Sequence, residues 1–89
     1  WILERYFRQF YRETGLYNIV TNYWEKDGRN EIDLIAVNEA DREIIIGEIK
    51  RNRSRIDLHK LEAKSEPICR KQKGWKVGYV GLSLDDMEA

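Results

Sequence analysis

The chain has 89 residues, of which 42% are hydrophobic and 36% are charged, and its net charge is zero. This length suits one domain with one core, the apolar content excludes a disordered tail, and the neutral balance excludes a uniformly basic nucleic-acid binder. A single cysteine and a single histidine exclude both an internal disulfide and a Cys/His zinc site. No apolar run approaches the length of a membrane helix, so we expect a single cytoplasmic domain over residues 1–89 without membrane contact.

The first half of the chain predicts a helix followed by antiparallel strands. Residues 1–13 repeat apolar side chains with the spacing of one helix face, and Gly15 suits the end of that helix. Residues 17–24 are rich in β-branched and aromatic side chains, which favours a strand. A cluster of turn-forming residues at 26–30 predicts a tight connection to the next strand.

Within residues 31–51, two β-rich apolar runs, residues 34–37 and 44–46, predict a hairpin. An even-length loop, either Ala40–Asp41 or Glu39–Arg42, makes the numbers of paired residues sum to 81. An odd-length loop would instead move facing residues to opposite sides of the sheet, because side chains alternate along a strand.

With the even-length loop, Asp33 faces Glu48 and Glu31 faces Lys50, and all four side chains project from one face. Two facing carboxylates cost stability unless a positive group lies between them, so this end of the hairpin predicts a cation site. The alternative is a cross-strand ion pair between Glu31 and Lys50, with Asp33 as an ordinary surface residue.

The second half predicts a crossover unit. Residues 51–55 form a polar connector in which Ser54 is available as a helix cap, and residues 56–69 predict a helix that Pro67 kinks or ends near Glu66. Residues 75–80 predict a fourth strand, parallel to the strand before the helix. Both faces of the hairpin are apolar near its turn, so helices should cover both faces. The fold class is therefore α/β, a three-layer α/β/α arrangement of order α-β-β-β-α-β with a four-stranded mixed sheet.

Positive charge gathers in residues 50–76, which hold ten Lys and Arg against three Asp and Glu. Such a segment could follow a phosphate backbone, or it could be an ordinary solvated surface. The residues we expect to contact nucleic acid are Arg51, Arg53, Arg55, Lys60 and Lys64.

Asp33 and Glu48 offer the hard oxygen ligands that Mg²⁺ or Mn²⁺ prefers. Lys50, on the same side, could orient a bound water or stabilise charge on a phosphate. Two carboxylates and a lysine are a minimal site for phosphodiester hydrolysis.

The element order, with Asp33 followed after fourteen residues by Glu48-Ile49-Lys50, resembles the PD-(D/E)xK nuclease superfamily. That superfamily has the restriction-endonuclease-like fold and includes type II restriction enzymes and archaeal Holliday-junction resolvases. The resemblance implies that Asp33, Glu48 and the main-chain carbonyl of Ile49 bind Mg²⁺ or Mn²⁺, and that Lys50 assists the attacking water. It also implies a catalytic glutamate from the first helix, where Glu4 matches by position.

Four segments are similar to the nuclease-like domain at the C-terminal end of certain archaeal and bacterial ATPases, usually catalogued as a domain of unknown function. They are residues 23–25, 30–36, 47–50 and 81–83. This similarity implies that the chain is a single nuclease-like domain from the C-terminal part of a larger protein, with an ATPase domain upstream in the same polypeptide. It also implies DNA as the partner and leaves a homodimer open.

Three functions follow as hypotheses. The first is a magnesium-dependent deoxyribonuclease that uses Glu4, Asp33, Glu48 and Lys50. The second is a DNA-binding or regulatory module with little or no cleavage, attached to the ATPase. The third is a protein-interaction domain on the same fold. Intact carboxylates and lysine favour the first hypothesis over the third but do not separate the first from the second.

Overall fold

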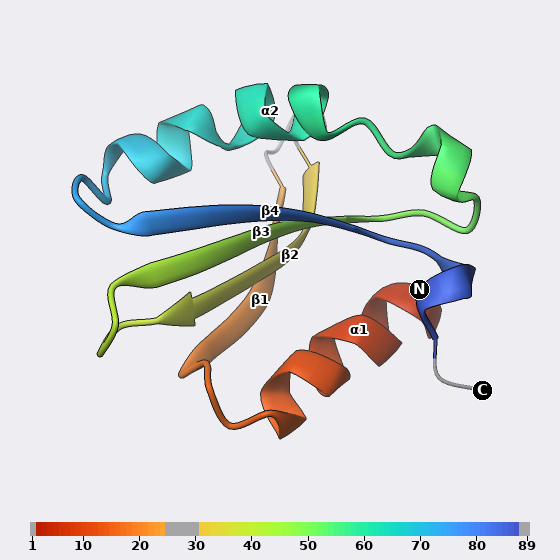
Figure 1. Ribbon diagram of the computed structural model, residues 1–89, viewed down its shortest axis with the longest axis horizontal. Helices are drawn as coiled ribbons and strands as arrows, with labels where there is room; N and C mark the ends of the chain where they lie inside the picture. Colours follow the sequence, from red (N-terminus) through yellow and green to blue (C-terminus); the bar gives the residue numbers. More distant parts are fainter. Residues whose placement is uncertain (1, 25–30, 88–89) are drawn as a thin grey trace.

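The structure, a computed structural model, describes residues 2–24 and 31–87 and shows a sheet covered by one helix on each face (Figure 1). The predicted order α-β-β-β-α-β is confirmed. The expected turn at residues 26–30 lies outside the described residues. The helices and strands are α1 (Ile2–Glu13), β1 (Ile19–Trp24), β2 (Glu31–Asn38), β3 (Glu43–Ile49), α2 (Leu58–Arg70) and β4 (Lys76–Leu82), with short 3-10 helices η1 (Arg53–Arg55) and η2 (Leu84–Asp86).

The sheet is mixed, as predicted. Its strand order is β1-β2-β3-β4, in which β1, β2 and β3 are antiparallel neighbours and β4 runs parallel to β3. Parallel neighbours need a long connection, and α2 supplies it by crossing the upper face in Figure 1 while α1 covers the lower face. No helix among the described residues is long and apolar enough to cross a membrane.

The predicted hairpin register is confirmed. Every pair from Leu34↔Gly47 to Asn38↔Glu43 has residue numbers that sum to 81, and the loop has four residues, Glu39–Arg42. Asn38 stabilises this loop, because its side-chain oxygen accepts the Asp41 N–H at 3.0 Å.

A bulge interrupts β2 at Asp33, next to the predicted site. Thr21 pairs with Ile35 and Tyr23 pairs with Ile32, so one residue of β1 opposes two residues of β2. The extra residue resets the alternation of side chains, because Ile32 packs in the same cluster as Ile35. A bulge re-aims side chains in this way and is common beside functional sites.

Two apolar clusters fill the space between the sheet and its helices. The cluster on the α2 side contains Ile32, Ile35, Ile44, Ile46 and Leu61. The cluster on the α1 side contains Leu3, Phe7, Leu34 and Ile49. Burial of both sheet faces explains why the hairpin is apolar on both sides near its turn.

The predicted cap of α2 is wrong. Asp57, not Ser54, caps this helix, and its side chain accepts the N–H groups of His59 and Lys60, both at 3.1 Å. Ser54 instead donates its N–H and hydroxyl to the side-chain oxygen of Asn52 within the connector.

The helix does not end near Glu66, one of the two predicted effects of Pro67, because α2 continues to Arg70. Proline removes one N–H from the helix, but Ile68 and Cys69 beyond it pack against the α2-side cluster. That packing offsets the lost hydrogen bond.

Candidate functional site

A hollow of about 350 Å³ lies where β2 begins and β3 ends. Its lining brings together most of the residues that the sequence indicated for catalysis, and two of its residues, Lys50 and Arg51, belong to the basic segment. The lining residues are Glu4, Glu31, Asp33, Ile49, Lys50 and Arg51.

Asp33 is anchored from two directions. Its carboxylate oxygen Oδ2 accepts the main-chain N–H of Ile49 at 2.8 Å, and its main-chain oxygen accepts Nη1 of Arg8 at 3.1 Å. The backbone pairing of β2 with β3 ends at Leu34↔Gly47. The Asp33 side chain therefore links the two strands just beyond their last backbone pair. The bulge therefore directs the Asp33 carboxylate toward Ile49 and the start of α1.

Glu4 comes from the first turn of α1 and lies beside Asp33. Its pKa is raised above the ordinary value of 4.5, first by burial and then by a hydrogen bond with Asp33 and by the Asp33 charge. Arg8 acts in the opposite direction through its positive charge. Two carboxyl groups that share a site in this way are costly to ionise together.

Glu48 does not line the hollow. It is only 8% exposed, and its Oε2 accepts the main-chain N–H of Asp57 at 3.0 Å, at the start of α2. The two carboxylates that the sequence predicted to share a cation therefore make different contacts, Asp33 with the Ile49 N–H and Glu48 with the Asp57 N–H. The register is as predicted, but the bulge turns Asp33 toward α1, whereas Glu48 stays on the α2 side.

The described residues contain no group of three or more His, Cys, Asp and Glu side chains that could hold a metal ion. The hollow does offer the adjacent carboxylates of Glu4 and Asp33, with Ile49 in its lining. Mg²⁺ is commonly held by one or two carboxylates together with waters and substrate phosphates, so this oxygen donor set fits Mg²⁺ or Mn²⁺.

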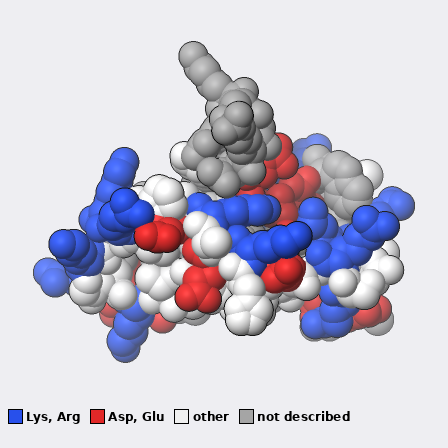
Figure 2. Space-filling view, turned by 90° about the horizontal axis from the view of Figure 1, so that it is seen from above, with Lys and Arg blue, Asp and Glu red and all other residues white. Residues whose placement is uncertain are grey.

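The five basic residues expected to contact nucleic acid have different surroundings. Arg51 lines the hollow. Arg53 forms an ion pair with Asp86, with 2.6 Å between Nη2 and Oδ1. Lys64 donates from Nζ to the main-chain oxygen of Glu31 at 3.5 Å. The remaining two, Arg55 and Lys60, are exposed on η1 and α2. Figure 2 views the α2 face and shows basic and acidic side chains interspersed on it.

Sequence reasoning missed Arg8, which holds the main chain at Asp33. A signal for it was present, because Arg8 follows Glu4 by four residues and such residues are neighbours on a helix surface.

A protein-family model matches residues 2–65, which run from the start of α1 into α2 and include every residue of the hollow. It is the model of DUF234, described as archaeal and bacterial proteins of unknown function. The chain belongs to the DUF234 family. This membership confirms the coarser part of the expected similarity, a family of unknown function in archaea and bacteria. No curated protein and no solved structure matches the chain.

Replacing Glu4 of this DUF234 domain with glutamine is expected to raise the melting temperature at neutral pH in the absence of metal. Because the folded pKa of Glu4 is raised, the folded protein loses stability as the pH rises through that pKa, and glutamine avoids this loss. Below about pH 4.5 the carboxyl is protonated in both states, so the gain should disappear there. Melting curves of wild type and Glu4→Gln across this pH range, with a chelator, check the prediction. A gain of equal size at every pH would contradict it.

Proposed function

We propose that this DUF234 domain is a nuclease that hydrolyses DNA phosphodiester bonds with Mg²⁺ or Mn²⁺. The observation that carries the proposal is the hollow itself, in which two adjacent carboxylates, Glu4 and Asp33, lie with Lys50 at an open end of the sheet. Carboxylates beside a lysine suit an anionic substrate that arrives together with a cation.

In this proposal Glu4, Asp33 and the main-chain carbonyl of Ile49 hold the ion. When bound, a divalent ion polarises a phosphoryl oxygen and lowers the pKa of a water. The chain fixes one ligand in advance, because the Ile49 N–H and the Arg8 guanidinium hold the side chain and main chain of Asp33. Lys50 is exposed at the hollow, where its ammonium group stabilises the charge that develops on the phosphate or orients the attacking water.

One observation favours a second candidate, a DNA-binding or regulatory module of an ATPase that cleaves weakly or not at all. Glu48 is the residue that the nuclease resemblance implies as a metal ligand, yet its carboxylate is buried and bonded to the Asp57 N–H. A domain without cleavage would retain Glu48 for this structural contact alone.

Cleavage assays with supercoiled, single-stranded and branched DNA test the proposal. We expect Mn²⁺-dependent cleavage that stops with a chelator and falls about 100-fold in Lys50→Ala, the usual effect of losing one electrostatic contact to the transition state. Lys73→Ala is the matched control, because Lys73 lies in the exposed turn after α2, at the other end of the sheet.

Unchanged cleavage in Lys50→Ala would rule out the role assigned to Lys50. Binding of DNA by the wild type without any cleavage would replace the nuclease by the second candidate.

A further inference from the structure

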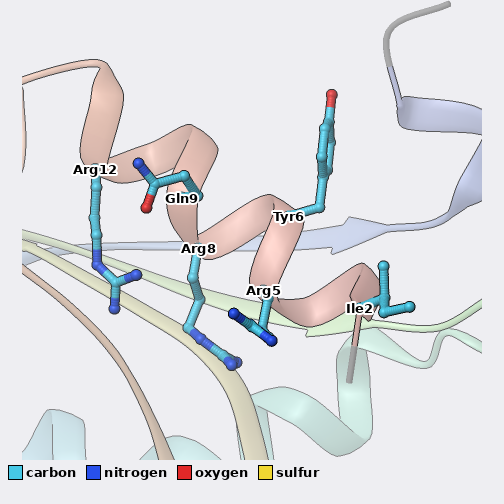
Figure 3. A pocket seen from close by; sticks show the side chains of 6 residues that line it. All are labelled: Ile2, Arg5, Tyr6, Arg8, Gln9 and Arg12. Atoms are coloured by element: carbon cyan, nitrogen blue, oxygen red, sulfur yellow. The ribbon is translucent and has the colours of Figure 1, made fainter.

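A second hollow, of about 630 Å³, runs along the exposed side of α1 (Figure 3). Three arginines repeat along it with the spacing of one helix face, and its lining among residues 2–24 and 31–87 includes no acidic residue. Figure 3 shows their side chains extending to the same side of the helix, toward the strands. The lining residues are Ile2, Arg5, Tyr6, Arg8, Gln9 and Arg12.

Two of these arginines are held in place by neutral main-chain groups. Arg8 donates from Nη1 to the Asp33 oxygen at 3.1 Å, and Arg12 donates from Nη2 to the Val20 oxygen at 3.1 Å. Each bond uses one of the five N–H donors of a guanidinium group. The arginine side chains are therefore oriented while most of their donors stay available to a ligand.

Within the described part of the chain the arginines of this row form no ion pair, although the charge of Arg8 also acts on Glu4. The ion pairs found there involve Arg53 and Arg70, and not Arg5, Arg8 or Arg12. Like charges three and four residues apart on a helix repel one another. An anion bound along the row would remove this repulsion, and arginine matches the geometry of phosphate oxygens in pairs of hydrogen bonds.

The length of the row suits a chain of phosphates rather than a single one. Arg12 follows Arg5 by seven positions, about 10 Å along a helix that rises 1.5 Å per residue. One nucleic-acid strand carries a phosphate about every 3.4 Å along its axis, so the row spans about three phosphates. The α2 face differs, because basic and acidic side chains alternate there (Figure 2).

The row is also continuous with the first hollow. Arg8 touches the main chain of Asp33, and the Asp33 side chain lines that hollow. A strand that lies along α1 would therefore reach the carboxylates and Lys50 without leaving the protein surface.

We propose that the arginine row of α1, formed by Arg5, Arg8 and Arg12, binds the sugar–phosphate backbone of DNA and directs it to the hollow at Asp33. This inference rests on the proposed function for its substrate, and it places the main binding surface on α1 instead of on α2.

Binding of a fluorescent DNA oligonucleotide in EDTA tests the row without cleavage. Arg5 is the residue to change, since it is exposed and, unlike Arg8 and Arg12, holds no strand carbonyl. We expect Arg5→Ala to weaken binding several-fold and to reduce the slope of log affinity against log salt by about one, the value for one phosphate contact. Arg5→Lys, which keeps the charge, should retain most of this slope. Lys73→Ala, in the exposed turn after α2, is the matched control and should bind as the wild type does, and Lys60→Ala tests the alternative surface on α2.

Equal affinity and salt slope in Arg5→Ala and the wild type would overturn the inference. A loss confined to Lys60→Ala would also overturn it, in favour of the α2 surface. The binding assay contains no metal, so it can show DNA binding by the arginine row even if the domain does not cleave DNA. If Arg5→Ala binds DNA as the wild type does, the cleavage assay still tests the nuclease proposal separately.

Discussion

Replacing Glu48 with leucine is expected to destabilise the protein by about 1–3 kcal/mol, because the N–H of the half-buried Asp57 loses its hydrogen-bond partner. Glu48 is 8% exposed and accepts the N–H of Asp57 at 3.0 Å. Asp57 in turn caps α2, so a displaced Asp57 would weaken the first turn of the helix as well. Urea denaturation should show a lower midpoint with an unchanged slope, which is the signature of a loss of stability alone.

Glu48→Gln is the matched variant, because its amide oxygen still accepts the Asp57 N–H. We expect it to keep nearly all of the stability that leucine loses. In the Mn²⁺ cleavage assay it should keep wild-type activity if Glu48 acts only at the start of α2. A stable Glu48→Gln protein whose cleavage falls 100-fold or more would show that Glu48 takes part in catalysis, as the nuclease resemblance implies, and would contradict the purely structural role.

The hairpin shows how far the sequence alone could predict this site. Its register followed from two apolar runs and an even-length loop, because a shift by one residue would move Leu34 and Ile46 to the wrong faces. The direction of the Asp33 side chain could not follow from the same pattern. It depends on a bulge opposite β1, and that bulge is a property of the pairing between two strands, not of either strand alone.

The start of α2 shows the same limit. Ser54 and Asp57 are both good helix caps, and the apolar Ile56 between them suits a first helical turn. The carboxylate of Glu48 binds the Asp57 N–H and so favours the later start. Tertiary contacts therefore decided two details that local propensity left open, although the order of elements and the topology of the sheet were predictable from periodicity and turn residues.

Replacing Asp33 with asparagine is expected to abolish the stabilisation of the folded protein by Mn²⁺ or Mg²⁺. A ligand at ten times its Kd adds about 1.4 kcal/mol to the stability of the state that binds it. For a domain of this size, that corresponds to a rise of about 6–11 °C in melting temperature. The wild type should show this rise, and Asp33→Asn should not, because it removes one of the two adjacent charges. Asparagine is preferred to alanine because its side-chain oxygen still accepts the Ile49 N–H.

Asp41→Asn is the matched control, since Asp41 lies in the loop at the other end of the hairpin and should respond to metal as the wild type does. Equal rises in Asp33→Asn and the wild type would place the metal away from the hollow. Without metal, Asp33→Asn should melt no lower than the wild type, because the repulsion between Glu4 and Asp33 is gone. A metal response lost in Asp33→Asn and cleavage kept in Glu48→Gln would together assign the ion to Glu4 and Asp33, on the α1 side of the sheet.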